Sequence, residues 1–205
     1  MRPLIGPRWR WWLISLLCVW LAIGIARSGE AATPLQQIDQ LAGRFTQQLY
    51  DENGQLLIES DGEFALLRPY YFRWEIQQPG QQLLVGDGEF LWQYDQDLAT
   101  VLRRPLADQL STPLGVLLAG EGELERAYEV EREADSLKLT PRGPNPLFAS
   151  IVIQLQDGLP RELTLVDTLG QNIQLLLELS PDKALEPADF TFQPPADVDL
   201  TVVGS

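Results

Sequence analysis

Apolar and polar residues alternate along most of the chain after residue 44, in short runs separated by turn residues. Apolar residues at every second position are typical of strands with one buried face. The runs predict strands over 45–50, 55–67, 71–77, 82–85, 89–94, 98–103, 127–132, 136–140, 147–155, 161–167 and 171–179. Turn pairs such as Asn53-Gly54 and Asp87-Gly88 lie between them and join antiparallel neighbours. We therefore expect an antiparallel meander of about eleven strands.

Two stretches break this alternation and predict short helices. The first runs from Thr33 to Gly43 with Leu35 on its apolar side, because Thr-Pro commonly starts a helix and glycine commonly ends one. The second runs from Thr112 to Gly120, includes Leu117 and is apolar nearly all round. A helix without a polar face must lie against apolar surface. We expect both helices to cover the apolar face of the sheet.

The hairpin over residues 62–76 shows the apolar pattern of that face most clearly. Phe64 and Leu66 share one parity on its first strand, and Phe72 and Trp74 share one on its second. Arg68 continues the parity of the first strand and is followed by a proline, which marks a strand end or edge. The pattern places a guanidinium at the rim of an apolar surface, where it is either a solvated strand-end charge or a donor to a partner.

Phe90 and Trp92 share one parity on a later strand. Together with Phe72 and Trp74 they predict one large aromatic surface. Two interpretations of it remain open: the core of a sandwich, with a second sheet packed on the first, or a curled sheet whose helices close an apolar cavity that holds a hydrophobic ligand. The second interpretation places Leu35 and Leu117 in the same cavity, with the guanidinium at its mouth.

The N-terminus predicts a secretory signal peptide. Three arginines precede an apolar run of fifteen residues, which is shorter than the about 20 residues that span a bilayer comfortably. This length favours a cleaved leader over an uncleaved anchor, and small residues fit cleavage after Ala26 or Ala31. Cys18, the only cysteine, lies inside the run and has no lipoprotein-type small residue before it. We expect a signal peptide over 1–26 and a single exported domain over 27–205.

Charge and composition narrow the function. Without residues 1–26 the chain has 12 basic and 29 acidic residues, a formal charge of −17, which disfavours nucleic acid and anionic lipid surfaces as partners. Histidine is absent, so imidazole metal sites and the usual hydrolytic triads are excluded. Asp95 and Asp97 could bind a cation, but acids in such a turn more often cap it. We expect no catalytic site, no metal site and no cofactor.

Several short motifs follow one another in order along the exported chain. They are Phe45-Thr46-Gln47, Gly62-x-Phe64, Arg68-Pro69, Phe72-x-Trp74, Asp87-Gly88, Leu91-Trp92-x-Tyr94-Asp95, Thr112-Pro113, Leu139-Thr140-Pro141 and Phe190-Thr191-Phe192-x-Pro194-Pro195. In their order and spacing they resemble the LolA family of periplasmic lipoprotein carriers. The resemblance implies a mainly β (α+β) fold: an incomplete antiparallel β-barrel of about eleven strands, with short helices as a lid over a hydrophobic cavity.

The resemblance also implies a function without chemistry. A monomeric periplasmic carrier would take the acyl chains of lipoproteins released by an inner-membrane ABC transporter and pass them to an outer-membrane acceptor. Arg68 would tether the lid, and the cavity would be lined by Leu35, Phe64, Leu66, Phe72, Trp74, Phe90, Trp92 and Leu117. An alternative of another class is a periplasmic lipid-sensing regulatory module of the same fold, whose output is a protein contact.

Overall fold

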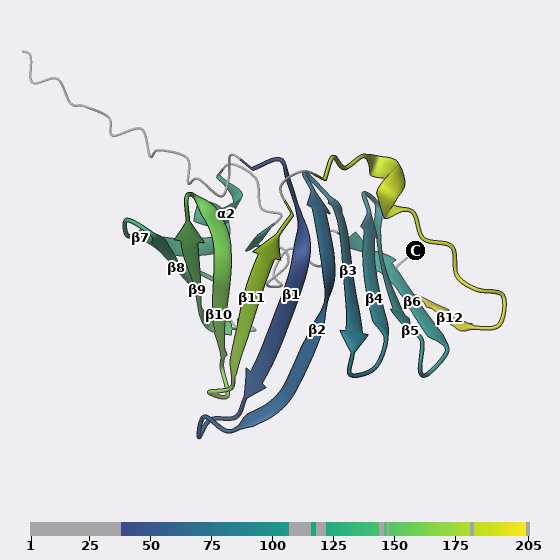
Figure 1. Ribbon diagram of the computed structural model, residues 1–205, viewed down its shortest axis with the longest axis horizontal. Coiled ribbons are helices and arrows are strands. Elements are labelled where there is room, and N and C mark those ends of the chain that lie inside the picture. The colour runs from purple at the N-terminus through teal and green to yellow at the C-terminus, as the bar shows by residue number, and fades with distance from the viewer. Residues whose placement is uncertain are drawn as a thin grey trace, which may run out of the picture. The chain divides into compact units, whose positions relative to one another are not determined.

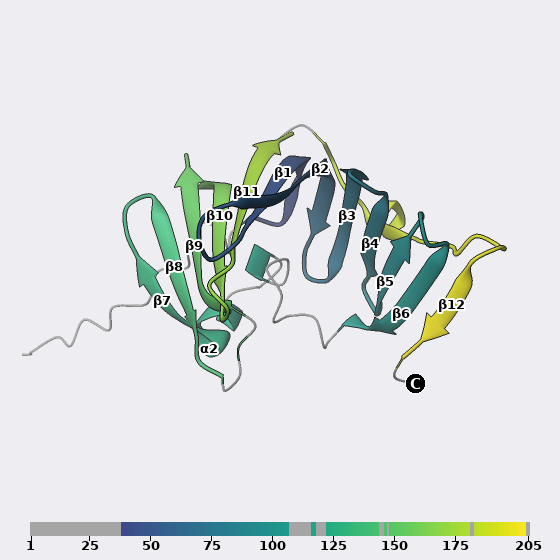
Figure 2. The same cartoon turned by 90° about the horizontal axis from the view of Figure 1, so that it is seen from below.

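The computed structural model describes residues 38–106, 116–117, 122–143, 146, 148–180 and 183–203. In this part of the chain, twelve strands form one continuous sheet in the order β12-β6-β5-β4-β3-β2-β1-β11-β10-β9-β8-β7. The sheet curves into an open arch, with β7 and β12 at its two free edges (Figure 1 and Figure 2). The expected mainly-β, incomplete barrel is confirmed.

Most of the strands lie close to the ranges predicted from alternation. They are β1 (Gln40–Tyr50), β2 (Leu56–Leu67), β3 (Tyr71–Gln78), β4 (Gln82–Asp87), β5 (Phe90–Asp95), β6 (Thr100–Pro105), β7 (Tyr128–Arg132), β8 (Ser136–Pro141), β9 (Phe148–Gln156), β10 (Leu159–Asp167), β11 (Asn172–Leu179) and β12 (Asp199–Val202). Neighbours pair antiparallel except β12, which runs parallel to β6 and was not predicted. Described helical structure comprises α2 (Glu123–Ala127), the 3₁₀ helix η3 (Pro187–Phe190), the helical pair formed by Val116 and Leu117, and Leu106 in 3₁₀ conformation.

Strand register sorts the side chains onto two faces. Across β2, β3 and β4, Phe64 is opposite Trp74 and Trp74 is opposite Leu84, so one face carries this row. The next row, which includes Val85 and Trp92, points to the other face. The face with Phe64 and Trp74 also buries Val116 and Leu117, and the face with Val85 and Trp92 buries Phe190. Figure 2 shows the C-terminal segment on the outer side of the arch, so we call the first face concave and the second convex.

The larger core lies on the concave face. Its members on β8 to β11 are aliphatic, and those on β1 to β3 are mainly aromatic. The buried residues of this concave cluster are Leu41, Phe45, Phe64, Leu66, Phe72, Trp74, Leu91, Leu106, Val116, Leu117, Leu124, Tyr128, Leu137, Leu139, Ile151, Ile153, Leu163, Leu165, Leu175 and Leu177. No second sheet covers it among the described residues, so the sandwich interpretation is wrong for this part of the chain.

A smaller core lies on the convex face, under the C-terminal segment 183–198. Phe190 of η3 is fully buried there against β3 and β4, beside Leu83 and Val85. The segment starts with a hydrogen bond from the Leu185 N–H to the side chain of Gln40 (3.1 Å) and continues into β12. It thus connects the middle of the sheet to its edge across the convex face (Figure 1).

The start of β1 corrects one prediction. The expected first helix was to end at Gly43, but Leu41, Ala42 and Gly43 belong to β1; Leu35 and the rest of that helix lie outside the described residues. A Cβ at Gly43 would lie 2.1 Å from the carbonyl oxygen of Glu178 on β11. The glycine therefore permits close strand approach in the sheet, whereas the sequence pattern had suggested a helix end.

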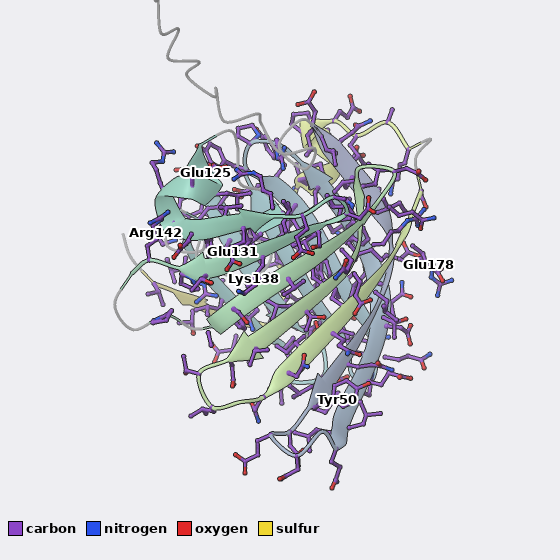
Figure 3. All side chains as sticks on the ribbon, turned by 90° about the vertical axis from the view of Figure 1, so that its left-hand side faces the viewer. Tyr50, Glu125, Glu131, Lys138, Arg142 and Glu178 are labelled. Carbon is purple, nitrogen blue, oxygen red and sulfur yellow. The ribbon has the colours of Figure 1, made fainter. Side chains whose placement is uncertain are left out.

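The outer edge strand β7 carries charge. Glu131 on β7 and Lys138 on β8 form an exposed ion pair at 2.7 Å, and both side chains are visible on the same surface in Figure 3. Glu129 and Arg132 are exposed on the same strand. Charged side chains at an edge discourage pairing with another chain.

The close approach at Gly43 predicts a strong effect of one methyl group. Gly43→Ala places a Cβ against backbone that cannot move without opening the β1–β11 pair, so we expect a loss of about 3 kcal/mol or more in the free energy of unfolding. Gly143→Ala is the control, because its Cβ meets nothing within 4 Å. Urea unfolding followed by circular dichroism measures both. Equal stability of the two variants would contradict the proposed packing.

Candidate functional site: the concave face and its cover

The centre of the concave face is built by the hairpin of β2 and β3. Antiparallel register places Leu66 opposite Phe72 and Phe64 opposite Trp74, and all four side chains are buried. They were named from sequence as one apolar surface, and the structure brings them together in one cluster. Leu117 joins the same cluster from a segment far away in the sequence.

Aromatic stacking fixes the indole of Trp74. The Phe45 ring lies 4.0 Å from it, nearly parallel, and the Phe64 ring lies 5.6 Å away in a tilted arrangement. Phe45 was not named as a site residue, although its odd position in β1 gives it the parity of Leu41. Phe72 fills the space above Gly86, where a Cβ would lie 2.5 Å from the ring. The aromatic part of the surface is therefore close-packed.

Val116 and Leu117 cover this surface. Both are helical and almost completely buried, and they pack in the concave cluster with Phe72 and Trp74. The expectation that an apolar helix in this region lies on the sheet is met by these two residues; the rest of the predicted 112–120 helix lies outside the described residues.

Arg68 holds the cover at the sheet end. Its Nη2 donates a hydrogen bond to the backbone carbonyl of Leu117 at 3.0 Å. Burial lowers the pKa of Arg68, and the carboxylates of Asp39 and Glu123 act in the opposite direction. A guanidinium keeps its proton at any physiological pH. The contact is therefore a charge-assisted hydrogen bond between the end of the β2–β3 hairpin and the covering segment.

The family model described as "Outer membrane lipoprotein carrier protein LolA" matches residues 36–193. A relative named outer-membrane lipoprotein carrier protein from Alkalilimnicola ehrlichii is 42% identical over 201 residues, covering 94% of each chain. This chain belongs to the LolA family. A relative of the same name from Halorhodospira halophila is 33% identical, covering 88% of this chain and 89% of its own.

Solved structures agree at the level of fold. An uncharacterised conserved protein from Thermus thermophilus aligns with a TM-score of 0.52 and 15% identity, covering 83% of this chain and 94% of its own. At that identity the likeness concerns the fold alone. The LolA-family chain described here has, in its described residues, no helix of the length and apolar character needed to cross a membrane.

The sequence-based assignment of Phe90 and Trp92 to the concave surface is wrong. Trp92 is opposite Val85 and packs in the convex cluster against Phe192, at a ring distance of 5.6 Å. The guanidinium of Arg103 lies over both rings, 4.5 Å from that of Phe90 and 5.4 Å from that of Trp92. Leu91, between them in sequence, points to the concave cluster instead. The alternation of side chains along β5 shows that Phe90 and Trp92 share one face and Leu91 lies on the other, but it does not show which of these faces is concave.

The C-terminal LolA motif explains the convex aromatics. Phe190 packs near Tyr71, and Phe192 packs between Trp92 and Tyr94. The Trp92 indole N–H donates to the Asp87 carboxylate at 2.7 Å, which also accepts the backbone N–H of Phe90. These contacts hold the C-terminal segment to the convex face of the sheet.

The described residues offer little for catalysis. Asp95 accepts the backbone N–H of Leu98 and Asp97 accepts that of Gln81, so both cap turns. No group of three or more acidic, histidine or cysteine side chains in the described ranges is placed to hold a metal ion. The concave surface offers apolar contacts, with the Arg68 guanidinium at its end.

The pH dependence of stability tests the contribution of Asp87, which accepts the hydrogen bond from Trp92 on the convex face. Burial alone would raise the pKa of Asp87, but hydrogen bonds from Phe90, Trp92 and Glu89 outweigh it and lower the pKa. The stabilising contribution is therefore fully present above the usual carboxyl pKa of about 3.9 and is lost as pH falls through the lower folded value. We expect the melting temperature of the native chain to exceed that of Asp87→Asn at pH 6, and this difference to shrink as the pH falls below the usual carboxyl pKa. A difference independent of pH would contradict this role.

Proposed function

We propose that this chain is a periplasmic carrier that takes the acyl chains of lipoproteins onto its concave face. One observation supports this most: Leu117 lies buried in the apolar cluster of the concave face, and its backbone carbonyl accepts a hydrogen bond from Arg68. Membership of the LolA family supports the same cargo. An acyl chain would replace Val116 and Leu117 on the sheet.

The balance of burial energies supports a reversible carrier. A chain of about 16 carbons gains roughly 0.8 kcal/mol for each methylene buried, or about 12 kcal/mol in all. Displacing Val116 and Leu117 costs about 1.5–3 kcal/mol each, and breaking the Arg68 hydrogen bond costs about 1.5–3 kcal/mol more. The cover therefore reduces the net affinity without preventing loading. A carrier needs such a reduction because it must release its cargo.

The route of the cargo is the remaining part of the proposal. In this proposal a signal peptide over 1–26 is removed on export and the single domain over 27–205 acts in the periplasm, where an inner-membrane ABC transporter would load it and an outer-membrane acceptor would unload it. A formal charge of −17 after cleavage keeps the monomer away from anionic membrane surfaces. No step makes or breaks a covalent bond, so no cofactor or catalytic residue is needed.

Removing the tether should strengthen retention. Arg68→Leu deletes the hydrogen bond to the Leu117 carbonyl, so the open state becomes more populated and cargo affinity rises by roughly tenfold. The variant should load lipoprotein from inner-membrane vesicles but pass less of it to the acceptor, measured as lipoprotein transferred per minute. Arg73→Leu is the matched control, since Arg73 lies on the convex face and pairs with Glu75. Normal transfer by Arg68→Leu would refute the tether.

The two tryptophans should report on opposite faces. After removal of residues 1–26 only Trp74 and Trp92 remain. In Trp92→Phe, the emission of Trp74 should shift when a synthetic triacylated lipopeptide is added, and acrylamide quenching should fall. In Trp74→Phe, the emission of Trp92 should stay unchanged. A response confined to Trp92 would place the ligand on the convex face and refute the proposed site.

A further inference from the structure

The strand β2 continues beyond the end of its neighbour β3. β2 pairs with β1 along its whole length, but its pairing with β3 starts only at Asp61, opposite Gln78, where β3 ends. Residues 56–60 therefore have a strand partner on one side only among the described residues. Figure 1 shows the β1–β2 hairpin extending past the lower end of β3.

This unpaired stretch carries apolar side chains that are left in water. Leu56, Leu57 and Ile58 are 45%, 45% and 49% exposed. Leu56 is opposite Tyr50 and Ile58 is opposite Leu49, so the bulge at Leu57 places Leu56 and Ile58 on opposite faces of the sheet. Apolar surface is therefore available on both sides of the edge. Ile58 is opposite Leu49, which is opposite Ile173 of β11, so an apolar row runs into the sheet from the edge.

The edge carries little charge, and its departure from regular pairing is a bulge at Leu57, because Tyr50 is opposite Leu56 and Leu49 is opposite Ile58. Proteins commonly guard such edges with charges, prolines or bulges, as the charged residues of β7 do here. Within residues 56–60 only Glu59 is charged, and its carboxylate already accepts a hydrogen bond from Gln48 at 2.6 Å. Three consecutive exposed apolar residues on an open edge fit a recognition surface.

The charge around the edge indicates the chemistry of its occupant. Between Phe45 and Leu67 the chain has five carboxylates and no lysine or arginine. The carboxylates belong to Asp51, Glu52, Glu59, Asp61 and Glu63. A second copy would bring the same negative charge to the contact, on a chain of net charge −14. A partner with basic side chains gains from this field.

We propose that residues 56–60 bind an extended segment of a partner protein by strand addition, and that apolar residues alternate with lysine or arginine in that segment. The added strand would occupy the line of β3 beyond Gln78. Backbone hydrogen bonds to the free edge would supply affinity, and the carboxylates would select the basic partner. This surface lies at the opposite end of β2 from Arg68, so it can be occupied whether or not the concave face holds cargo.

Hydrogen exchange with a designed peptide tests the proposal. The probe is the peptide Lys-Val-Lys-Val-Lys-Val-Lys-Val added to the mature chain, and the control peptide is Glu-Val-Glu-Val-Glu-Val-Glu-Val. We expect the Lys-Val peptide to slow exchange of backbone amides within 56–60 by about tenfold and the Glu-Val peptide to leave them unchanged. No protection there, or equal protection by both peptides, would overturn the proposal.

A pair of variants adds an affinity measurement. Ile58→Lys puts a cation on the edge and should weaken binding of the Lys-Val peptide about tenfold, whereas Leu200→Lys changes an exposed apolar residue on β12 and should not. Melting curves establish that both variants fold, and lipopeptide binding read from Trp74 should remain native in both. Equal peptide affinity of the two variants would overturn the proposal. A dimer of the native chain that Ile58→Lys dissociates would assign the edge to a second copy and overturn it as well.

Discussion

Both faces of an open sheet need apolar cover, and this constraint governs the whole chain. Each strand sends alternate side chains to opposite sides, so burying one face leaves the other in water unless a separate segment covers it. On the convex face the cover is the C-terminal segment with Phe190 and Phe192, anchored by aromatic contacts. On the concave face the curvature of the sheet brings apolar rows together, and Val116 and Leu117 cover part of them.

The two covers differ in how they are attached, and the difference gives the protein its proposed function. The convex segment is fixed by a hydrogen bond at Gln40, by the buried ring of Phe190 and by pairing of β12 with β6. The concave pair is held by burial and by the Arg68 hydrogen bond. On the proposed function, the cover of the concave face exchanges with an acyl chain.

The alternation of the sequence was enough to predict the strands and the antiparallel order, because each strand contributes its own period of two. The register between strands was harder to predict from the sequence. Phe90 and Trp92 were assigned to the concave face because they share a parity, but only the register with Val85 decides which face that parity meets. Arg68 was found because a cation continued an apolar pattern before a proline. β12 was missed because four exposed residues carry no clear pattern.

Other misses have the same physical origin. Gly43 had suggested a helix end, yet its role depends on the approach of Glu178, more than a hundred residues later in the chain. The open edge at 56–60 depends on where β3 stops relative to β2, which no local pattern encodes. Local sequence patterns thus predicted the individual strands. The composition of the candidate site depends on how those strands pair, which local patterns do not encode.

On the proposed function, an apolar chain binds on the concave face and displaces its cover. Methyl-labelled protein with a spin-labelled fatty acid tests this binding, because the label broadens methyl signals close to it. We expect broadening of Ile151, Leu163 and Leu117, with Leu83 and Val85 of the convex cluster unaffected at the same ligand concentration. Broadening confined to Leu83 and Val85, or equal on both faces, would contradict it.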